Sequence, residues 1–347
     1  MQPDFFVSPR AAACGDSLDR RTMIRSLALA MAGGLLLGGC GKRPGGAGAL
    51  PVLRAAITGK GEGDTRLMLK ASAIEPEGVR IDYSVFSSGQ LVVEALNGGA
   101  LDCGNMSEIP PVFAASSPIR SFRQIAVVRA DVNNQAVVVP KDSPIQSLAD
   151  LKGRQVGYVR ATTSQYFLIR MLESVGLAWS DIVPIPMGVS DGLAAFSNGK
   201  LDAWAIYGYP IQRVMANDGA RILKTARGFL SGNYIVLAHV DALADPVRAD
   251  SIGRYLRMSK RGYSWVASHQ NEWAATVAAE IGVPLADVQD EFRRKSLNYE
   301  LRPVTEEAIA SQQLVADVFA QQRVIARRVD VRPLWDERFN SVILERA

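Results

Sequence analysis

The sequence predicts an α/β protein of two lobes, each built around a mostly parallel sheet, and three observations lead to this prediction. Short apolar strands alternate with segments of helical spacing through residues 52–207. The order of elements returns about 100 residues on, where Gly99-Ala100-Leu101-Asp102 matches Gly199-Lys200-Leu201-Asp202. A chain of 347 residues has room for two such units. Alternating strands and helices imply parallel sheets with ligand sites at the carboxyl ends of the strands.

The first unit begins with an apolar strand and ends with the start of a third strand at Leu101. Alternating or continuous apolar runs predict the strands, and helical spacing followed by glycine predicts the helices. The first unit then contains strands at 52–57 and 80–86 and helices at 67–74 and 90–97. The second contains strands at 154–159, 182–187 and 201–207, a helix at 163–175 and a helix after Ser190.

Two further strand-like runs, 135–139 and 233–238, bracket the second unit and predict crossovers between the lobes. From Pro246 onward the spacing is helical, and we expect these helices to pack on lobe one. They span 246–268, 271–281, 285–295 and 305–322. We therefore expect a signal peptide at 1–39, a tether at 40–51, lobe one at 52–137 and 235–347, and lobe two at 138–234.

Composition excludes several classes of protein. The 39 Lys and Arg residues are scattered and nearly balanced by 35 Asp and Glu, which argues against a nucleic-acid partner. Three Cys and two His build neither a zinc finger nor a disulfide framework, and we expect no metal and no cofactor. We expect Cys103 to behave as a small buried hydrophobe.

The first forty residues have the pattern of an export signal. Arg20-Arg21 precedes an apolar run that is too short to span a bilayer and ends in Leu37-Gly38-Gly39-Cys40. The paired arginines resemble a twin-arginine signal, and the final string resembles a bacterial lipobox. We expect a periplasmic protein anchored to the membrane through lipid on Cys40, although a general secretory signal with cleavage elsewhere is the alternative.

Several separated strings carry a resemblance to one family. The segments 139–145 and 148–153 look like the beginning of lobe two in periplasmic solute-binding proteins of ABC importers. More narrowly, the chain resembles the aliphatic-sulfonate-binding family of the nitrate, sulfonate and taurine group, through the strings at 94–102, 109–115, 195–204 and 312–317. The resemblance runs from about Leu53 to Trp335. It implies a type II periplasmic binding-protein fold in which two lobes close on a ligand and deliver it to a membrane permease.

The strongest candidate for anion binding is the turn Arg160-Ala161-Thr162-Thr163-Ser164-Gln165, which follows a strand and opens a helix. Thr162 and Gln165 fit a capping box, so amides of the first turn and nearby hydroxyls are available to a sulfonate. An ordinary helix cap is the alternative. Arg160 departs from the family pattern of a small residue here, and it faces either the anion or solvent.

Further candidates come from equivalent positions in the other turns. The matching turn of lobe one contains Ser87, Ser88 and Gly89, and the next strand is followed by Ser107 and Glu108. Near the cleft, Tyr207 ends one expected strand and Asn233 begins another. Glu108 either binds a ligand amine or caps the helix that begins at Pro110. Gly208 replaces an acidic residue frequent in relatives, which favours a purely anionic ligand. The glycine-rich loop 60–66 lets backbone amides approach a ligand, while Lys60 and Arg66 are either ligand contacts or solvated.

We therefore expect an extracytoplasmic solute-binding lipoprotein that captures a small organic anion, an alkyl or aryl sulfonate or sulfate ester, for an ABC permease. It would work as a monomer, and it would not be an enzyme. Two alternatives remain: a sensor that presents its ligand to a membrane receptor, and an enzyme on the same scaffold. His239 and His269 have no nucleophile or acid at motif spacing, which weakens the enzyme alternative.

Overall fold

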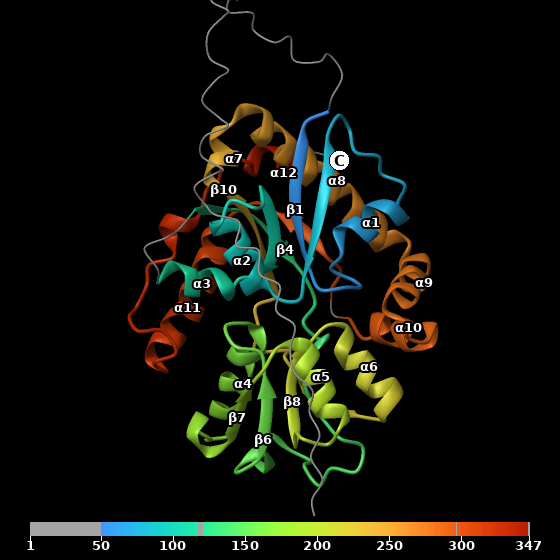
Figure 1. Ribbon diagram of the computed structural model, residues 1–347, viewed down its shortest axis with the longest axis vertical. Helices are drawn as coiled ribbons and strands as arrows, with labels where there is room; N and C mark the ends of the chain where they lie inside the picture. The colour runs from blue at the N-terminus through green and yellow to red at the C-terminus, as the bar shows by residue number, and fades with distance from the viewer. Residues whose placement is uncertain (1–49, 117–120, 296, 346–347) are drawn as a thin grey trace, which may run out of the picture. The chain divides into compact units, whose positions relative to one another are not determined.

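The strands of this chain form two separate sheets, each with helices packed on its faces (Figure 1). The computed structural model describes residues 50–116, 121–295 and 297–345. The first sheet has the order β11-β4-β10-β3-β1-β2, and the second has the order β7-β6-β8-β5-β9. The α/β class with two sheets is confirmed. Both sheets are mixed, however, because β10 and β5 run antiparallel to their neighbours.

The first sheet contains β1 (Val52–Thr58), β2 (Arg80–Phe86), β3 (Cys103–Ser107), β4 (Phe122–Arg129), β10 (Asn233–His239) and β11 (Glu300–Arg302). The second contains β5 (Gln135–Val139), β6 (Gln155–Tyr158), β7 (Val183–Pro186), β8 (Ala203–Tyr207) and β9 (Arg221–Thr225). The chain changes sheets between β4 and β5 and again between β9 and β10. The predicted crossover strands therefore exist, each lying wholly within one sheet. The division of the chain into lobes stays a prediction.

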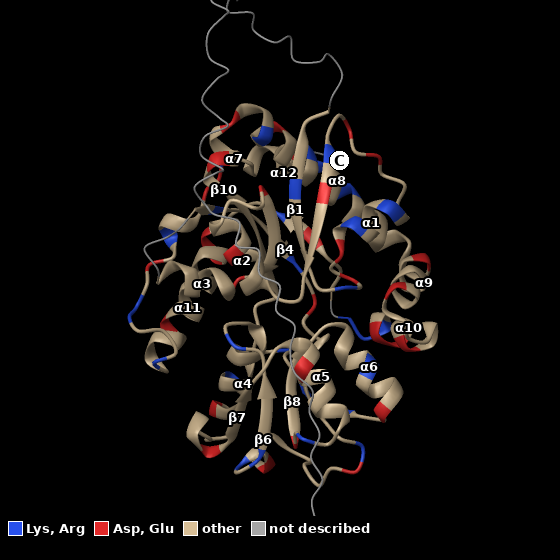
Figure 2. Cartoon of the chain, in the orientation of Figure 1, with Lys and Arg blue, Asp and Glu red and all other residues tan. Residues whose placement is uncertain are grey.

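The helices before β10 are α1 (Thr65–Ala71), α2 (Gly89–Asn97), α3 (Pro110–Ala115), α4 (Thr163–Glu173), α5 (Val189–Ser197) and α6 (Tyr209–Asp218). Those after β10 are α7 (Val240–Ala244), α8 (Pro246–Ser268), α9 (Gln270–Ile281), α10 (Leu285–Arg293), α11 (Glu306–Gln321) and α12 (Asn340–Leu344). In the described ranges, no helix has the length and apolar character that a membrane span requires. Figure 2 shows residues of both charge signs interspersed over these elements.

The two faces of the first sheet have separate cores. One core joins β1 to α1, α8 and α9 through side chains such as Met68, Leu256 and Trp273. The other joins the sheet to α2, α3 and α11 through side chains such as Val92 and Phe319. The C-terminal helices α8, α9 and α11 therefore pack on the first sheet. The helix α10 contacts both α9 and α6.

Some boundaries differ from the sequence prediction for local reasons. The helix α1 begins at Thr65 and not at Leu67, because the Asp64 carboxylate accepts a hydrogen bond from the Leu67 N–H at 3.0 Å and caps the helix there. The helix α5 is capped by Gly188, so Ser190 lies in its first turn and not before it. The strands β4, β9 and β11 and the helix α6 were not predicted.

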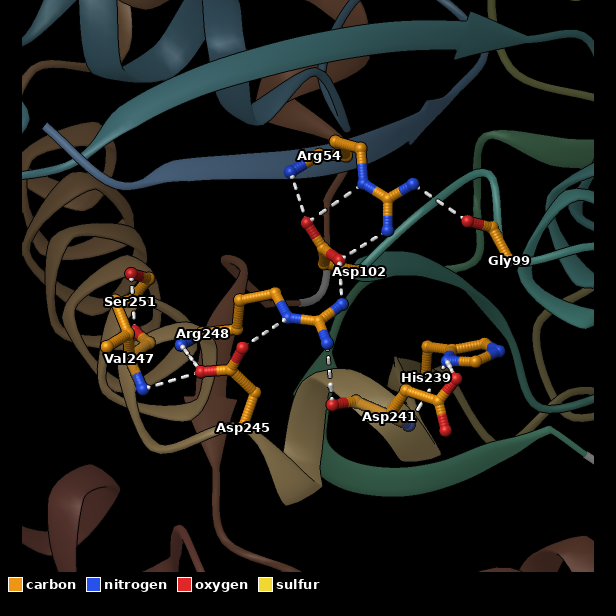
Figure 3. Close-up of polar contacts among 9 residues, drawn as sticks. All are labelled: Arg54, Gly99, Asp102, His239, Asp241, Asp245, Val247, Arg248 and Ser251. Atoms are coloured by element: carbon orange, nitrogen blue, oxygen red, sulfur yellow. Dashed lines mark hydrogen bonds and ion pairs between the residues drawn. The ribbon is translucent and has the colours of Figure 1, made fainter. Parts of the chain in front are cut away.

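Asp102, in the turn before β3, ties three elements together through one buried carboxylate (Figure 3). It accepts a hydrogen bond from the Arg54 backbone N–H at 2.8 Å and pairs with the Arg54 guanidinium at 2.7 Å. Arg248 of α8 lies 3.4 Å from the same carboxylate. Burial opposes its ionisation, but hydrogen bonds from Arg54 and the charges of both arginines hold the pKa of Asp102 below its usual range.

Asp202 occupies the matching turn before β8. Its carboxylate accepts a hydrogen bond from the backbone N–H of Gln155, the first residue of β6, at 2.8 Å. The Asp102 carboxylate makes the equivalent bond to Arg54 near the start of β1. The sequence repeat at an offset of 100 residues is therefore a structural repeat, in which β1, β2 and β3 correspond to β6, β7 and β8.

These two aspartates give a matched pair of variants. D102A removes a backbone hydrogen bond and two ion pairs, and we expect a loss of about 3 kcal/mol, because each arginine that remains is only partly exposed to water. D202A removes one backbone hydrogen bond and is expected to cost about 1 kcal/mol. Urea unfolding of both variants measures the difference, and equal losses would show that the arginines contribute nothing to stability.

Candidate ligand-binding site

A cavity of about 340 Å³ is lined by loops that follow strands of both sheets. In the first sheet these are the β1–α1 loop and the ends of β2 and β3, and in the second they are the start of α5 and the turn from β8 into α6. The helices α9 and α10 supply a further wall. The lining ranges from the two sheets are 58–63, 85–87, 105–106, 189–190 and 207–210. The carboxyl ends of strands therefore form the cavity, as the alternation of strands and helices predicts.

One part of the lining is rich in groups that favour an anion. The residue before α5, Gly188, has no side chain that could cap the helix. The backbone amides of Val189 and Ser190 in the first turn of α5 are therefore open to a ligand. Lys60 and Ser87 also line the cavity. At the start of α6, Gly208 has φ 71° and ψ −154°, a conformation that favours glycine. Glycine at this position is therefore a backbone requirement of the turn.

The wall beside α10 is acidic. Glu62 of the β1–α1 loop and Glu291 of α10 both line the cavity, and Glu62 forms an ion pair with Lys295. Burial raises the pKa of Glu62, while the charge of Lys295 opposes the shift. Burial and the charge of Glu62 raise the pKa of Glu291 to about 7. The cavity thus contains both donors for an anion and buried carboxylates.

Among the predicted site residues, Ser87 and Tyr207 line this cavity. Burial raises the pKa of the Tyr207 phenol above its usual range, so the side chain stays neutral and offers a hydroxyl. Tyr209 and residues of the predicted glycine loop line the cavity as well. Trp204 is fully buried in a core on the second sheet. Ligand contact by any of these residues stays a prediction.

The side chains of the predicted anion turn, 160–165, make hydrogen bonds within the turn, and Thr163 lines a second, smaller cavity. Thr162 caps α4, as predicted, and its hydroxyl also donates to the Val159 carbonyl at 2.8 Å. The Ser164 hydroxyl lies 2.9 Å from the Val159 N–H. Gln165 accepts from the Ala161 N–H at 2.8 Å, so the reciprocal half of the predicted capping box does not form. Arg160 is exposed and lines neither described cavity.

Packing of α4 limits the space beside this turn. Tyr166 and Ile169 join the core that contains α3 and α11, and the Tyr166 ring meets the Phe319 ring edge-on at 5.5 Å between centroids. The small cavity beside the turn is lined by Ser107 and Thr163 and has a volume of about 10 Å³. That space holds at most one water molecule. Anion binding by this turn stays a prediction.

Glu108 and Asn233 line the same small cavity, and other side chains bind both of them. The Glu108 carboxylate accepts hydrogen bonds from Ser231 at 2.5 Å and from Ser311 at 3.0 Å. It does not cap α3, which begins without a side-chain cap, so that alternative is wrong. Arg129 donates to the Asn233 side chain at 2.8 Å.

Ser88 and Gly89 belong to the packing of α2 on the first sheet. Ser88 is the N-cap of α2 but makes no side-chain capping bond, and it is buried. A Cβ atom at Gly89 would lie 2.7 Å from the Cβ of Met106, so only glycine allows α2 to pack this closely on β3. Neither residue lines a described cavity.

Sequence reasoning missed Glu62, Ser190 and Glu291 as lining residues. Glu62 lies between Gly61 and Gly63 in the glycine-rich loop 60–66. Its place in that loop is the sequence signal that could have identified Glu62 as a lining residue. The sequence predicts Ser190 only as the residue that precedes a helix. Glu291 lies on a helix that gives no local signal, because only the placement of α10 beside α6 brings it to the cavity.

A family model described as NMT1/THI5 like matches residues 75–273. The chain belongs to the NMT1/THI5-like family.

Named relatives and solved structures of similar chains agree with this membership. A protein of Escherichia coli (strain K12) named as an aliphatic sulfonates-binding protein is 29% identical over 258 residues, which covers 74% of this chain and 79% of that protein. The alkanesulfonate-binding protein SsuA from Xanthomonas axonopodis pv. citri, solved bound to MOPS, has a TM-score of 0.73 and 24% identity over 83% of this chain and 99% of its own. The desulfurization enzyme DszB has a TM-score of 0.60 and 16% identity over 85% of this chain and 99% of its own.

The buried Glu108 gives this NMT1/THI5-like protein a testable pH dependence. A glutamate has a pKa of about 4.3 when unfolded, whereas burial raises the pKa of Glu108 to about 7, against its serine hydrogen bonds. Between these values the folded chain holds a proton that the unfolded chain releases. This residue therefore lowers stability as the pH rises from about 4.3 to about 7, by up to about 3 kcal/mol.

E108Q removes this titration. Urea unfolding of E108Q and wild type at two pH values, about 4.5 and about 7.5, measures the stability gap between them. The gap is expected to shift by about 3 kcal/mol in favour of the variant as the pH rises. A gap that does not change with pH would contradict the raised pKa.

Proposed function

We propose that this chain is an extracytoplasmic solute-binding protein that captures an organic sulfonate and delivers it to an ABC permease. The observation that carries the proposal is the cavity of about 340 Å³, in which the uncapped start of α5 and Lys60 stand beside apolar side chains. Backbone amides and one ammonium suit the three oxygens of a sulfonate, and Val85, Phe86 and Met106 suit an alkyl or aryl tail.

Relatives support the same ligand class. The Escherichia coli relative is named for aliphatic sulfonates, and SsuA of Xanthomonas axonopodis pv. citri was solved with MOPS, which carries a sulfonate. The first match covers 74% of this chain and the second covers 83%. Closure of two lobes, hinged where the chain passes from β4 to β5 and from β9 to β10, would enclose the ligand.

Export and anchoring are a second part of the proposal, based on sequence alone. Arg20, Arg21 and Cys40 lie outside the described residues. The order of basic residues, apolar run and Leu-Gly-Gly-Cys supports secretion to the periplasm and lipid attachment at Cys40. The glycine-rich residues before Leu50 would then tether the folded body to the membrane.

Binding is favoured over catalysis by the chemistry of the lining. Its residues include neither histidine nor cysteine in the part of the chain described. Burial raises the pKa of the Cys103 thiol far above its usual value, so the thiol is a poor nucleophile. The Asp241 N–H donates to His239 Nδ1 at 3.1 Å, so that nitrogen serves the start of α7.

A thermal-shift panel of alkyl and aryl sulfonates on the mature protein tests the ligand class. A ligand at a hundredfold excess over its Kd stabilises the folded state by about 2.7 kcal/mol. S190P removes one backbone N–H donor at the start of α5. Ser190 is the second residue of α5, and Pro210 is the second residue of α6, so a helix of this protein already accepts proline at that position. We expect S190P to weaken sulfonate binding about tenfold or more, and S190A to weaken it less.

Wild-type affinity in S190P would exclude the start of α5 as the anion site. If no sulfonate in the panel shifts the wild-type melting temperature, the proposed ligand class is wrong. Circular dichroism of S190P and S190A checks that both variants keep the fold.

C40S tests the anchor. Wild type is expected to incorporate labelled fatty acid and to fractionate with membranes, while C40S does neither, because the serine hydroxyl replaces the thiol that carries the lipid. Metabolic labelling and fractionation of both proteins give the readout. Absence of label on the wild-type protein would show that Cys40 is not lipidated.

A further inference from the structure

The acidic wall of the cavity holds a carboxylate that is only half satisfied. The side chain of Glu62 is 9% exposed, and its Oε1 pairs with Lys295, whose side chain is 5% exposed. Its second oxygen, Oε2, is buried and has no hydrogen-bond partner among the described residues. A buried carboxylate oxygen without a donor is costly, so the position of Glu62 indicates that a partner from outside the chain binds there.

Glu291 adds a second carboxylate to the same wall. Burial and the nearby charge of Glu62 raise its pKa to about 7, and Lys295 and Arg294 only partly offset this. Arg294 is engaged elsewhere, because it pairs with Asp290 at 3.0 Å and its side chain is 55% exposed. Lys295 is shared further, since its ammonium also lies 3.1 Å from the centroid of the Phe292 ring. One buried cation therefore serves two carboxylates.

Two amide oxygens increase this excess of acceptors. Asn105 Oδ1 and Asn134 Oδ1 are buried in residues that line the cavity, and neither has a hydrogen-bond partner in the described part of the chain. With Glu62 Oε2 they make three carboxylate and amide oxygens of the lining that have no partner among the described residues, and the Tyr207 hydroxyl is a fourth unpaired oxygen there. An ammonium group supplies up to three N–H donors and a positive charge, which matches both the number of acceptors and the sign of the wall.

We propose that the ligand is a zwitterion, an aminosulfonate whose ammonium group binds at Glu62 and Glu291 while its sulfonate binds the donors of the same cavity. This inference rests on the proposed function and narrows its ligand class. The sequence alone favoured a purely anionic ligand, because Gly208 replaces an acidic residue. Glu62 of the β1–α1 loop and Glu291 of α10 supply carboxylates to the cavity from other segments of the chain. A comparison of position 208 alone does not reveal these carboxylates.

Ligands that differ only in the ammonium group test the proposal. Taurine and propane-1-sulfonate have the same number of heavy atoms and the same sulfonate, and homotaurine and butane-1-sulfonate form a second pair with a longer chain. Calorimetry is done at about pH 8, above the pKa of about 7 to which burial raises Glu291. We expect the wild-type protein to bind the better aminosulfonate about 10- to 100-fold more tightly than its alkyl partner, since hydrogen bonds between charged groups are strong.

Variants assign the preference to residues. E291Q, which breaks no ion pair of the described chain, is expected to lower aminosulfonate affinity about tenfold and to leave alkanesulfonate affinity within about twofold. The double variant E62Q/K295Q removes one charge of each sign, avoids an unpaired buried lysine, and should remove most of the remaining preference. E272Q, on the exposed surface of α9, is the matched control and should change neither affinity.

The outcomes separate this proposal from the proposed function. Equal affinity for the members of both pairs, or tighter binding of the alkanesulfonates, would overturn the zwitterion proposal and leave sulfonate binding intact. A preference for aminosulfonates that survives in both E291Q and E62Q/K295Q would equally overturn it, because the ammonium would then bind elsewhere. Failure of all four ligands together with every sulfonate of the thermal-shift panel would overturn the proposed function itself.

Discussion

A carboxylate at the start of the third parallel strand holds each sheet of this protein in register. Asp102 and Asp202 follow the same Gly-x-Leu turn, and each accepts the backbone N–H at the start of the neighbouring strand. Parallel strands have no hairpin to align them, so a side chain that bridges strand starts fixes which residues face each other. In the first sheet the arginines of β1 and α8 add charge to this contact (Figure 3). The alignment of the strand ends, where the cavity forms, depends on this register.

The two antiparallel strands complete the arrangement. The strand β5 arrives from the first sheet and pairs with β8 and β9, and β10 returns from the second sheet and pairs with β3 and β4. Each sheet is thus completed by a strand that enters from the other part of the chain. In the proposed function, the connections at these two places would act as hinges for closure on a ligand. Asn134 and Tyr234, which follow or lie on these connections, also line the cavity.

The cavity combines two kinds of electrostatic environment within one volume. Open helix amides and Lys60 favour negative charge, whereas Glu62 and Glu291 favour positive charge. A ligand with a single charge satisfies one of these environments and leaves the other uncompensated. These two environments together favour a zwitterionic ligand. When a zwitterion moves from water into the cavity, each of its charges loses water but gains a partner that the protein holds in place. The tyrosines and apolar side chains between α9, α10 and the sheets add contact area without charge.

The sequence by itself determined the α/β class, the repeat at an offset of 100 residues, the crossover strands and most helices, because these follow from short-range periodicity and turn residues. It also singled out the glycine loop and Tyr207, which line the cavity. Only the tertiary structure decided which turns reach the cavity. The turn at Thr162 has the local features of an anion site, but only the folded chain packs Tyr166 against Phe319 and leaves a cavity of about 10 Å³ at Thr163. Glu291 has no local feature of a site and reaches the cavity through the placement of α10. Hydrogen-bonding potential is a property of a short segment, whereas access to a ligand depends on which distant side chains pack over that segment.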